Sequence, residues 1–337
     1  MKNNTNPNSN LIKIGIVGCG GVAESHADGY GENQGCKITQ VYDLNPETDK
    51  AFSKVTQSQV AGSIKEMIES GEVDAVSVCT PPVAHMENCQ PFLEAGIPVL
   101  CEKPLELNAE RASHLAELAE KSGTIFLMGF THRFHAPIRE ALKIVRSGEL
   151  GKPVYFRNAF GGFSSIEGNH RSNPKISGGG SLNDTSSHSV DLFRLFMGEA
   201  RSVTATIDNI VQKCQVEDFG LISIVGEEGT HGHIMATWSL PVVRNMLEIK
   251  CTEGTISVNY YIPGRPDLTI QKRDDDTEQT IEVSGPFKFT AMVSHFLDCI
   301  RNGTKPEATV NDGLESSRII GAAYESAKTK RAVEIKN

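Results

Sequence analysis

A glycine turn between an apolar strand and a helix most constrains what this sequence can fold into. The apolar run at residues 11–17 leads into Gly18-Cys19-Gly20-Gly21-Val22-Ala23, and Asp43 ends the next apolar run. In this order Gly18 makes a sharp turn, Gly20 lets a pyrophosphate approach the backbone, and Ala23 lets the helix pack close to the sheet. A carboxylate at the end of the second strand can accept hydrogen bonds from a ribose diol. The pattern therefore predicts a dinucleotide site rather than an ordinary glycine-rich loop.

Strands and helices alternate through about residue 130. We expect strands at 36–42, 73–79, 97–101 and 125–128, and helices that begin at Pro46, follow Ser63-Ile64-Lys65-Glu66, or span 83–94 and 110–121. The serine and glutamate at 63 and 66 have the spacing of a capping box, which marks a helix start. Such alternation predicts an α/β fold with a doubly wound parallel sheet, the Rossmann type.

Longer β-rich stretches follow from about residue 150. We expect strands at 154–163, 203–211, 220–225, 231–240, 246–251 and 255–261, and two final helices at 289–301 and 312–330. Consecutive strands without helices between them predict an antiparallel or mixed sheet, so the second domain is expected to be α+β. We place a frayed tail at 1–10, the dinucleotide domain at 11–130 and the second domain at 131–337. The junction could also lie later, at 148–151.

Composition narrows the class of ligand and the compartment. The 337 residues are enough for two domains, and the net charge of −9 comes without a basic run, which argues against nucleic acid or a membrane surface as partner. A small molecule fits better. The polar start lacks the apolar segment of a signal peptide, and none of the eight cysteines forms a Cys-x-x-Cys pair, so we expect reduced thiols in the cytoplasm. The histidine pairs 132/135 and 231/233 lack a third ligand nearby, and we predict no metal site.

Glu102-Lys103-Pro104 is the first segment that carries polar groups where packing does not require them. It follows the expected strand at 97–101, and open α/β sheets bind their ligands at the carboxyl ends of strands. A lysine there can exchange a hydrogen bond or a proton with a substrate hydroxyl. For a lone lysine, a solvated loop residue is the ordinary alternative.

The second such segment runs from Gly178 to Asp191. If a helix begins within the glycines, Asp184 and His188 lie four residues apart on one face, with Asp191 one turn further. Val190, Phe193 and Met197 would then form the opposite, buried face. A carboxylate and an imidazole displayed together are a candidate acid–base pair, although such pairs also occur as plain helix-surface contacts.

These motifs together resemble the glucose–fructose oxidoreductase / inositol dehydrogenase / MocA family over essentially the whole chain after the tail. The resemblance rests on the glycine turn, Thr80-Pro81-Pro82 with His85 after it, Glu102-Lys103-Pro104, and the 178–191 segment closed by Leu195-Phe196-Met197-Gly198. Ala236-Thr237-Trp238 and Asp312-Gly313-Leu314 agree with it. The resemblance implies a Rossmann domain, a C-terminal domain with a large open sheet, and NAD(P)-dependent oxidation or reduction of a sugar or cyclitol. It also implies a homo-dimer or homo-tetramer and a last helix able to fold back on the Rossmann domain.

The family's catalytic lysine, aspartate and histidine correspond to Lys103, Asp184 and His188. We expect NAD rather than NADP, because Asp43 would repel a 2′-phosphate and Leu44 offers no compensating cation. The expected cofactor site consists of the glycine turn and of residues that follow the next three expected strands. Its residues are Gly18, Gly20, Gly21, Val22, Ala23, Asp43, Thr80, Pro81, His85, Glu102 and Lys103.

The resulting hypothesis is hydride transfer from a secondary alcohol carbon to nicotinamide, with His188 as general base, Lys103 bonded to the reacting oxygen, and Asp184 orienting the substrate or holding the other two. The base role could instead belong to Lys103. Further substrate contacts could come from basic side chains that flank the expected cleft: His132, Arg133, Arg157, His170 and Arg171. Two other functions stay open, namely an enzyme that retains NAD and cleaves glycosides by transient oxidation, and a non-catalytic dinucleotide-binding regulator.

Overall fold

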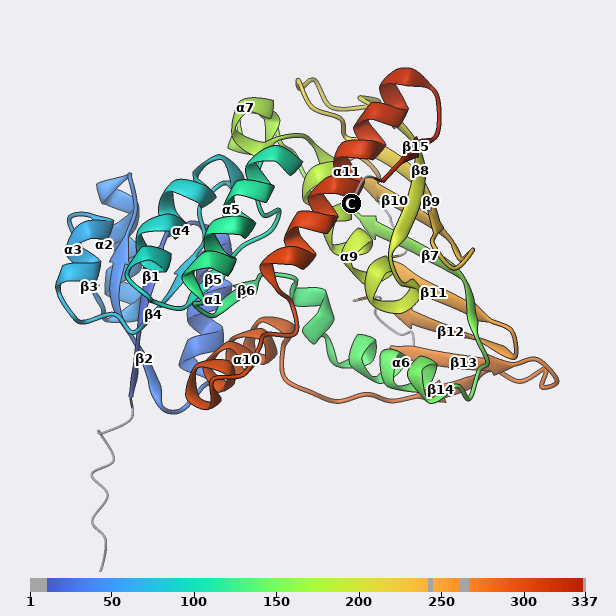
Figure 1. Cartoon of the computed structure of the whole chain (residues 1–337), viewed down its shortest axis with the longest axis horizontal. Coiled ribbons are helices and arrows are strands. Elements are labelled where there is room, and N and C mark those ends of the chain that lie inside the picture. Colours follow the sequence, from blue (N-terminus) through green and yellow to red (C-terminus); the bar gives the residue numbers. More distant parts are fainter. Residues whose placement is uncertain (1–10, 242–244, 261–266, 336–337) are drawn as a thin grey trace, which may run out of the picture. The chain divides into compact units, whose positions relative to one another are not determined.

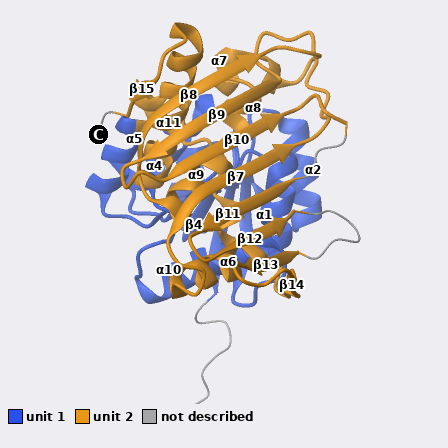
Figure 2. Ribbon diagram, turned by 90° about the vertical axis from the view of Figure 1, so that its right-hand side faces the viewer, with its two compact units in different colours: residues 1–102, 113–129, 287–310 blue, residues 103–112, 130–286, 311–337 orange. Residues whose placement is uncertain are grey.

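The fold is described from a computed structural model that covers residues 11–241, 245–260 and 267–335 (Figure 1). The predicted tail at 1–10 and residue 261, the end of a predicted strand, lie outside these residues. The chain forms two compact units (Figure 2). Unit 1 comprises residues up to 102, 113–129 and 287–310, and unit 2 comprises 103–112, 130–286 and 311 onward. The division of the chain at residue 130 stays a prediction.

Unit 1 is built on a six-stranded parallel sheet of strand order β3-β2-β1-β4-β5-β6. Its strands are β1 (Ile12–Val17), β2 (Cys36–Tyr42), β3 (Gln59–Val60), β4 (Ala75–Val78), β5 (Val99–Cys101) and β6 (Phe126–Met128). The central strands β4 and β5 are fully buried and apolar apart from Ser77, and burial of each Val or Leu side chain contributes about 1.5–3 kcal/mol. The strand order reverses between β1 and β4, which confirms the doubly wound fold and places the ligand-binding crevice of this fold at that point.

Local signals in the sequence set the helices of unit 1. They are α1 (Gly21–Gly31), α2 (Pro46–Thr56), α3 (Ile64–Glu69), the 3-10 turn η1 (Pro82–Ala84), α4 (His85–Glu94), α5 (Ala109–Ser122), whose first residues belong to unit 2, and α10 (Lys288–Asn302). The Ser63 hydroxyl caps α3 by accepting a hydrogen bond from the Glu66 amide at 3.1 Å. Helix α10 packs on α1 at Gly29, where a Cβ atom would lie 3.2 Å from the Phe289 carbonyl oxygen. A small residue at this position therefore permits the close contact.

Unit 2 is built on a nine-stranded sheet of order β14-β13-β12-β11-β7-β10-β9-β8-β15, in which β7 and β10 are parallel and the other neighbours antiparallel. Its strands are β7 (Pro153–Gly161), β8 (Ala200–Asp208), β9 (Phe219–Gly226), β10 (His231–Thr237), β11 (Met246–Cys251), β12 (Gly254–Asn259), β13 (Leu268–Lys272), β14 (Gln279–Ile281) and β15 (Val333–Glu334). The predicted mainly antiparallel sheet is confirmed.

The two faces of this sheet differ in polarity. Phe156, Ile222 and Ile234 point to the same face and are buried, whereas their neighbours Leu221 and His233 are exposed on the other face. Helices α6, α9 and α11 cover the buried face in Figure 1, and Figure 2 looks onto the outward face. The sheet therefore presents a solvated surface on one side and the core of unit 2 on the other.

The helices of unit 2 carry most of the candidate site. They are the 3-10 turns η2 (Thr131–Phe134) and η3 (His170–Ser172), and the α-helices α6 (Ala136–Ser147), α7 (Pro174–Ser177), α8 (Ser181–Asp184), α9 (Ser186–Met197) and α11 (Val310–Thr329). A helix begins directly after Gly180, close to the glycines considered in the sequence analysis, and Thr185 divides it into α8 and α9. Among the described residues, no helix is both long and apolar enough to cross a bilayer.

Candidate active site

The glycine turn of unit 1 has the backbone geometry that a dinucleotide requires. Gly18 has a φ of +85°, and a Cβ atom there would lie 2.8 Å from the backbone of Cys79 and Thr80, at the end of the neighbouring strand β4. Only glycine avoids both the strain and the clash. At Gly20 and Gly21 an added Cβ would meet no atom within 4 Å. The start of α1 thus faces open space that a pyrophosphate can fill, with the positive end of the helix dipole toward it.

Asp43 lies one residue beyond β2, and its carboxylate is fixed by the backbone. Oδ2 accepts a hydrogen bond from the Cys19 amide at 2.8 Å, and Oδ1 accepts one from the Asn45 amide at 2.9 Å. Each oxygen keeps a further lone pair for a ribose hydroxyl. Because Cys19 belongs to the glycine turn, the phosphate-binding and ribose-binding elements are joined by one hydrogen bond. These residues fit a dinucleotide.

The Thr80-Pro81-Pro82 turn is held from below by His85. The imidazole of His85 is fully buried, and its Nε2 lies 2.8 Å from the Thr80 carbonyl oxygen. The Thr80 hydroxyl accepts a hydrogen bond from Asn88 at 3.2 Å. His85 therefore shapes the turn after β4 from within, and direct cofactor contacts by Thr80 and Pro81 stay predictions.

Glu102, the residue after β5, belongs to a buried polar cluster of unit 1. Its Oε1 lies 3.0 Å from Nε2 of His26 on α1, and Nδ1 of His26 lies 3.2 Å from the Ser77 hydroxyl. Tyr30 completes the cluster at 2.8 Å from Ser77. Burial raises the pKa of Tyr30, so it stays a hydrogen-bonding phenol. The cluster connects the helix after the glycine turn with the segment that leads directly into Lys103.

Lys103 and Asp184 form an ion pair within unit 2. The Lys103 Nζ lies 2.7 Å from Asp184 Oδ1 and 3.1 Å from the Asp184 carbonyl oxygen. Burial opposes the charged form of Asp184, but Lys103, Arg171 and His170 outweigh it and lower the pKa of Asp184. The pair joins residues 81 positions apart in sequence. The structure thus brings together two of the three predicted catalytic residues in direct contact.

His188 lies in the first turn of α9, within an aromatic cluster. Its ring stacks on His132 of η2 with a centroid distance of 4.3 Å and an interplanar angle of 10°. The rings of Phe130 and Phe160 lie edge-on to the His188 ring, with centroid distances of 6.3 and 6.4 Å. On its other side His132 stacks on Tyr260 at 5.3 Å. Only 8% of His188 is exposed, so packing fixes the ring plane.

The glycines before Asp184 are required by a second buried contact. A Cβ atom on Gly180 would lie 1.9 Å from the Glu217 carbonyl oxygen. The Glu217 carboxylate accepts hydrogen bonds from the amides of Gly180 and Leu182, both at 2.9 Å, and from the Tyr324 hydroxyl at 2.7 Å. Burial raises the pKa of Glu217 despite these bonds. This clamp sets where α8 begins, and so where Asp184 stands.

The basic residues proposed as further substrate contacts separate into four groups. Arg133 is buried in ion pairs, and Arg157 lies on the outward face of the sheet opposite His233. His170 and Arg171 are exposed on η3, and both act on the charge of Asp184. His132 contacts His188 rather than standing alone. Among the described residues, no cluster of three or more metal-ligating side chains is present.

Two family models match most of the chain. Residues 12–130 match an oxidoreductase family with an NAD-binding Rossmann fold, and residues 138–257 match the C-terminal domain of the same family. The chain belongs to the Gfo/Idh/MocA oxidoreductase family. Binding of an NAD(P) dinucleotide follows from the first of these matches.

Several relatives of this chain in the Gfo/Idh/MocA family are dehydrogenases that act on CH–OH groups of sugars or inositols. The D-apiose dehydrogenase of Paraburkholderia graminis is 22% identical over 97% of this chain and 90% of its own length. The inositol 2-dehydrogenase of Rhizobium meliloti is 23% identical over 96% and 99%. The solved structure of a levoglucosan dehydrogenase with NADH and L-sorbose has a TM-score of 0.90 at 21% identity, covering 97% of this chain and 99% of that chain. This last similarity shows that the fold is shared.

Sequence reasoning did not identify the partners of the candidate catalytic residues. The stack of His132 on His188, the Glu217 clamp and the pairing of Arg133 with Asp191 all join residues that are distant in sequence. A local signal was present for helix α6, where Pro137 near the start and Gly148 at the end mark a helix. That helix was not among the predicted elements.

Proposed function

We propose that this chain oxidises a secondary hydroxyl of a sugar or cyclitol and uses NAD as the hydride acceptor. The proposal rests mainly on the 2.7 Å contact between Lys103 Nζ and Asp184 Oδ1. Asp184 in turn lies four residues before His188. A dinucleotide-binding regulator needs the cofactor site of unit 1 but has no use for an ammonium, a carboxylate and an imidazole placed together. The relatives that are sugar dehydrogenases support the same reaction class.

The cofactor site determines which dinucleotide is preferred. NAD, when bound, supplies the oxidised nicotinamide that accepts a hydride. Gly20 and Gly21 leave room for the pyrophosphate, and Asp43 presents a fixed carboxylate to the ribose. A 2′-phosphate would bring like charge to Asp43, and the exposed Leu44 beside it provides no cation. We therefore infer a preference for NAD over NADP.

The three candidate catalytic residues differ in the chemistry that their surroundings allow. Asp184 is held as a carboxylate and keeps the Lys103 ammonium as a hydrogen-bond donor, which suits stabilisation of a developing alkoxide. An imidazole has an ordinary pKa of about 6.5 and so accepts a proton near neutral pH. We assign proton acceptance to His188 and charge stabilisation to Lys103.

His170 and Arg171 extend the candidate site toward solvent. Although most of the residue is exposed, partial burial of His170 and the neighbouring Arg171 lower its pKa against the opposing effect of Asp184, so the imidazole is neutral at pH 7. A neutral imidazole both donates and accepts hydrogen bonds, as hydroxyl-rich ligands require. We infer that these two side chains contact substrate hydroxyls beyond the reacting carbon.

A panel of cyclitols, aldoses and sugar acids, screened for NADH absorbance, tests the function. We expect the wild type to release NADH with at least one member, and His188→Ala to lower kcat by about 10²–10⁴-fold, as loss of a general base does. His114→Ala, at an exposed position of α5, is the matched control and should leave kcat unchanged. Product formed without free NADH would point to retained cofactor, and NAD binding without turnover would point to a regulator.

We also propose that a second copy of the chain packs on the outward face of the nine-stranded sheet. Leu221 is 44% exposed there, and Met235 pairs with it on the neighbouring strand. The wild type should elute as a dimer or tetramer in light-scattering chromatography, and Leu221→Lys should weaken the assembly. A monomeric wild type would contradict the proposal.

All eight cysteines are free thiols, and on that ground we propose a reducing, cytoplasmic location.

A further inference from the structure

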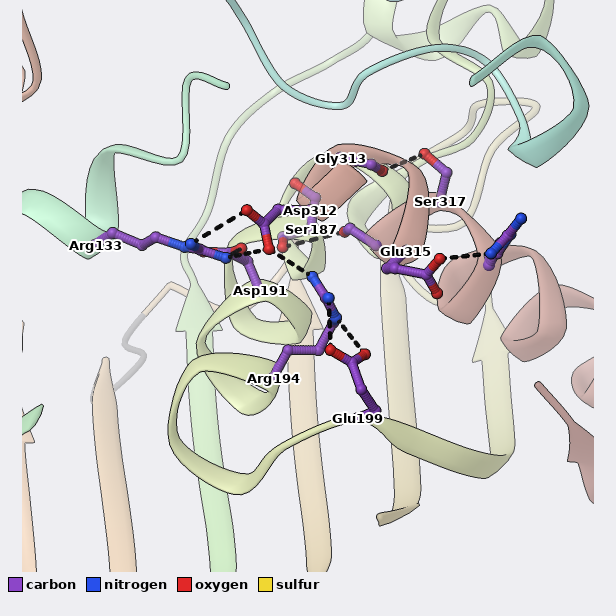
Figure 3. Close-up of polar contacts among 11 residues, drawn as sticks. Arg133, Ser187, Asp191, Arg194, Glu199, Asp312, Gly313, Glu315 and Ser317 are labelled. Atoms are coloured by element: carbon purple, nitrogen blue, oxygen red, sulfur yellow. Dashed lines mark hydrogen bonds and ion pairs between the residues drawn. The ribbon is translucent and has the colours of Figure 1, made fainter. Parts of the chain in front are cut away.

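A buried network of charges ties three segments of unit 2 together (Figure 3). Arg133 Nη2 lies 2.5 Å from Asp191 Oδ1, and Arg133 Nε donates to Asp191 Oδ2 at 2.8 Å, which makes the contact two-pronged. Arg133 Nη2 also lies 3.1 Å from Asp312 Oδ1, to which Arg194 donates at 3.0 Å. At the edge of the network Arg194 forms an ion pair with Glu199, with 2.7 Å between Nη2 and Oε1.

The network crosses between elements rather than along one helix. Arg133 belongs to η2, Asp191 and Arg194 to α9, and Asp312 to the first turn of α11. Arg133 and Asp191 are 58 positions apart, and the Asp191 side chain has no exposed surface. Burial raises the pKa of Asp191, and Arg133 opposes that rise. Charges this deep are stable only when paired, so the position of η2 on α9 is tightly specified.

The two-pronged contact between Arg133 and Asp191, called the fork below, has a histidine near each of its two residues. His132 immediately precedes Arg133, and His188 lies one helical turn before Asp191, on the same side of α9. The two rings stack at 4.3 Å and nearly in parallel. Fixing Arg133 on Asp191 therefore fixes the His132 ring against the His188 ring.

We propose that Arg133 and Asp191 are positioning residues for His188, acting through the stacked ring of His132. The inference rests on the proposed function, in which His188 accepts the substrate proton. A catalytic imidazole must be held within about 0.5 Å of its productive position by supporting residues. Arg133 is 7% exposed and bonded to two carboxylates, which distinguishes it from a substrate contact.

Variants at the fork test the inference by kinetics. Asp191→Asn keeps the shape and loses the charge, whereas Arg133→Lys keeps the charge and loses the fork. For both we expect kcat to fall by about 10²-fold, since a small misplacement of a reacting group has effects of that size. The KM for the sugar and the Kd for NADH should stay within a factor of about 3. Glu199→Gln, at the exposed end of the network, is the matched control and should behave as wild type.

A double variant separates positioning from folding. Asp191→Asn removes one of the two carboxylates that pair with the buried Arg133 guanidinium, and Arg133→Lys removes the two-pronged contact with Asp191, so either protein could unfold for that reason alone. Arg133→Gln combined with Asp191→Asn leaves a neutral pair that can hydrogen-bond, so the Tm should recover relative to the single variants. If the fork positions His188, kcat of the folded double variant should remain below that of wild type. A folded double variant with wild-type kcat would overturn the inference.

Ring signals test the same inference without turnover. Stacked rings shift each other's NMR resonances, so the ring C–H signals of His132 and His188, assigned with His132→Phe and His188→Ala, should move in the folded double variant. Unmoved signals would overturn the inference even if no sugar is oxidised by the wild type. Absence of wild-type turnover together with shifted signals would instead count against the proposed function alone.

Discussion

At the scale of single residues, Lys103 has an oppositely charged partner, because the Asp184 carboxylate lies 2.7 Å from its ammonium. Lys103→Met keeps much of the side-chain length and removes the charge, and Lys103→Arg keeps the charge in a wider, planar group. Both should lower kcat by about 10²-fold or more, because the lost interaction acts on charge that develops in the transition state. NADH affinity should stay near wild type.

Steady-state kinetics and NADH titration of both Lys103 variants check this expectation. Lys175→Met, which removes an exposed lysine of α7 in the same unit, is the control. Near-normal turnover of Lys103→Met on a confirmed substrate would remove Lys103 from the mechanism.

Asp184 links the site to acid stability. Burial disfavours its charged form, but Lys103, Arg171 and His170 lower its pKa overall, so folding favours the ionised carboxylate. Its contribution to stability is therefore complete above the ordinary carboxyl pKa of about 3.9 and is lost as pH falls through the lower folded value. Tm measured against pH should show wild type above Asp184→Asn at neutral pH, with the gap closing in acid.

The exposed Asp274→Asn provides the comparison, and its Tm should follow that of wild type. A gap between wild type and Asp184→Asn that stays constant down to about pH 2 would show that the carboxylate charge does not contribute.

We expect the single carboxylate of Asp43 to determine the choice between NAD and NADP. Asp43→Ser should narrow the preference for NAD over NADP by about tenfold or more, since tenfold corresponds to only ~1.4 kcal/mol of repulsion. Titration of both cofactors measures the ratio, and Glu47→Ser, an exposed position on the following helix, should leave it unchanged. Tighter binding of NADP by the wild type would refute the assignment.

At the scale of elements, two glycines of the same turn should respond differently to alanine. Gly18→Ala forces a positive φ and a 2.8 Å contact with backbone, which should cost about 1–3 kcal/mol of stability from strain alone. Gly20→Ala has open space around its Cβ, so the fold should persist while the added methyl group meets the pyrophosphate. We expect Tm to fall for Gly18→Ala and the Kd for NADH to rise for Gly20→Ala.

Gly31→Ala, at the far end of α1, is the control for both measurements because its Cβ would also meet no atom. If Gly20→Ala bound NADH as tightly as wild type, the glycine turn would not be the pyrophosphate site.

Elements that are specified by a few neighbouring residues could be predicted from the sequence, and those that depend on contacts with distant segments could not. The glycine turn, the strand at 36–42 and the cap at Ser63 rest on a few neighbouring residues, and the structure confirms them. The exact start of α8 at Ser181 could not be predicted, because Glu217 and Tyr324 fix it from segments far along the chain. Periodicity alone favours one continuous helix there.

The same limit holds for the whole molecule. Motifs predicted Lys103, Asp184 and His188 as catalytic residues, but not their contacts. Lys103 lies 81 positions from its partner Asp184, and His188 lies 56 positions from His132, on which its ring stacks. Arg133 shows the difference most clearly. As a basic residue beside a predicted cleft it suggested a substrate contact, and the structure buries it between Asp191 and Asp312 instead.

The central claim is that a hydride leaves a sugar or cyclitol carbon for NAD. A substrate found in the panel, deuterated at the carbon that is oxidised, tests this directly when the released NADH is analysed by mass spectrometry. We predict one deuterium per NADH, carried on the nicotinamide ring, with a rate that falls in His188→Ala. NADH without deuterium, or a deuterated product formed with no release of NADH, would contradict the account.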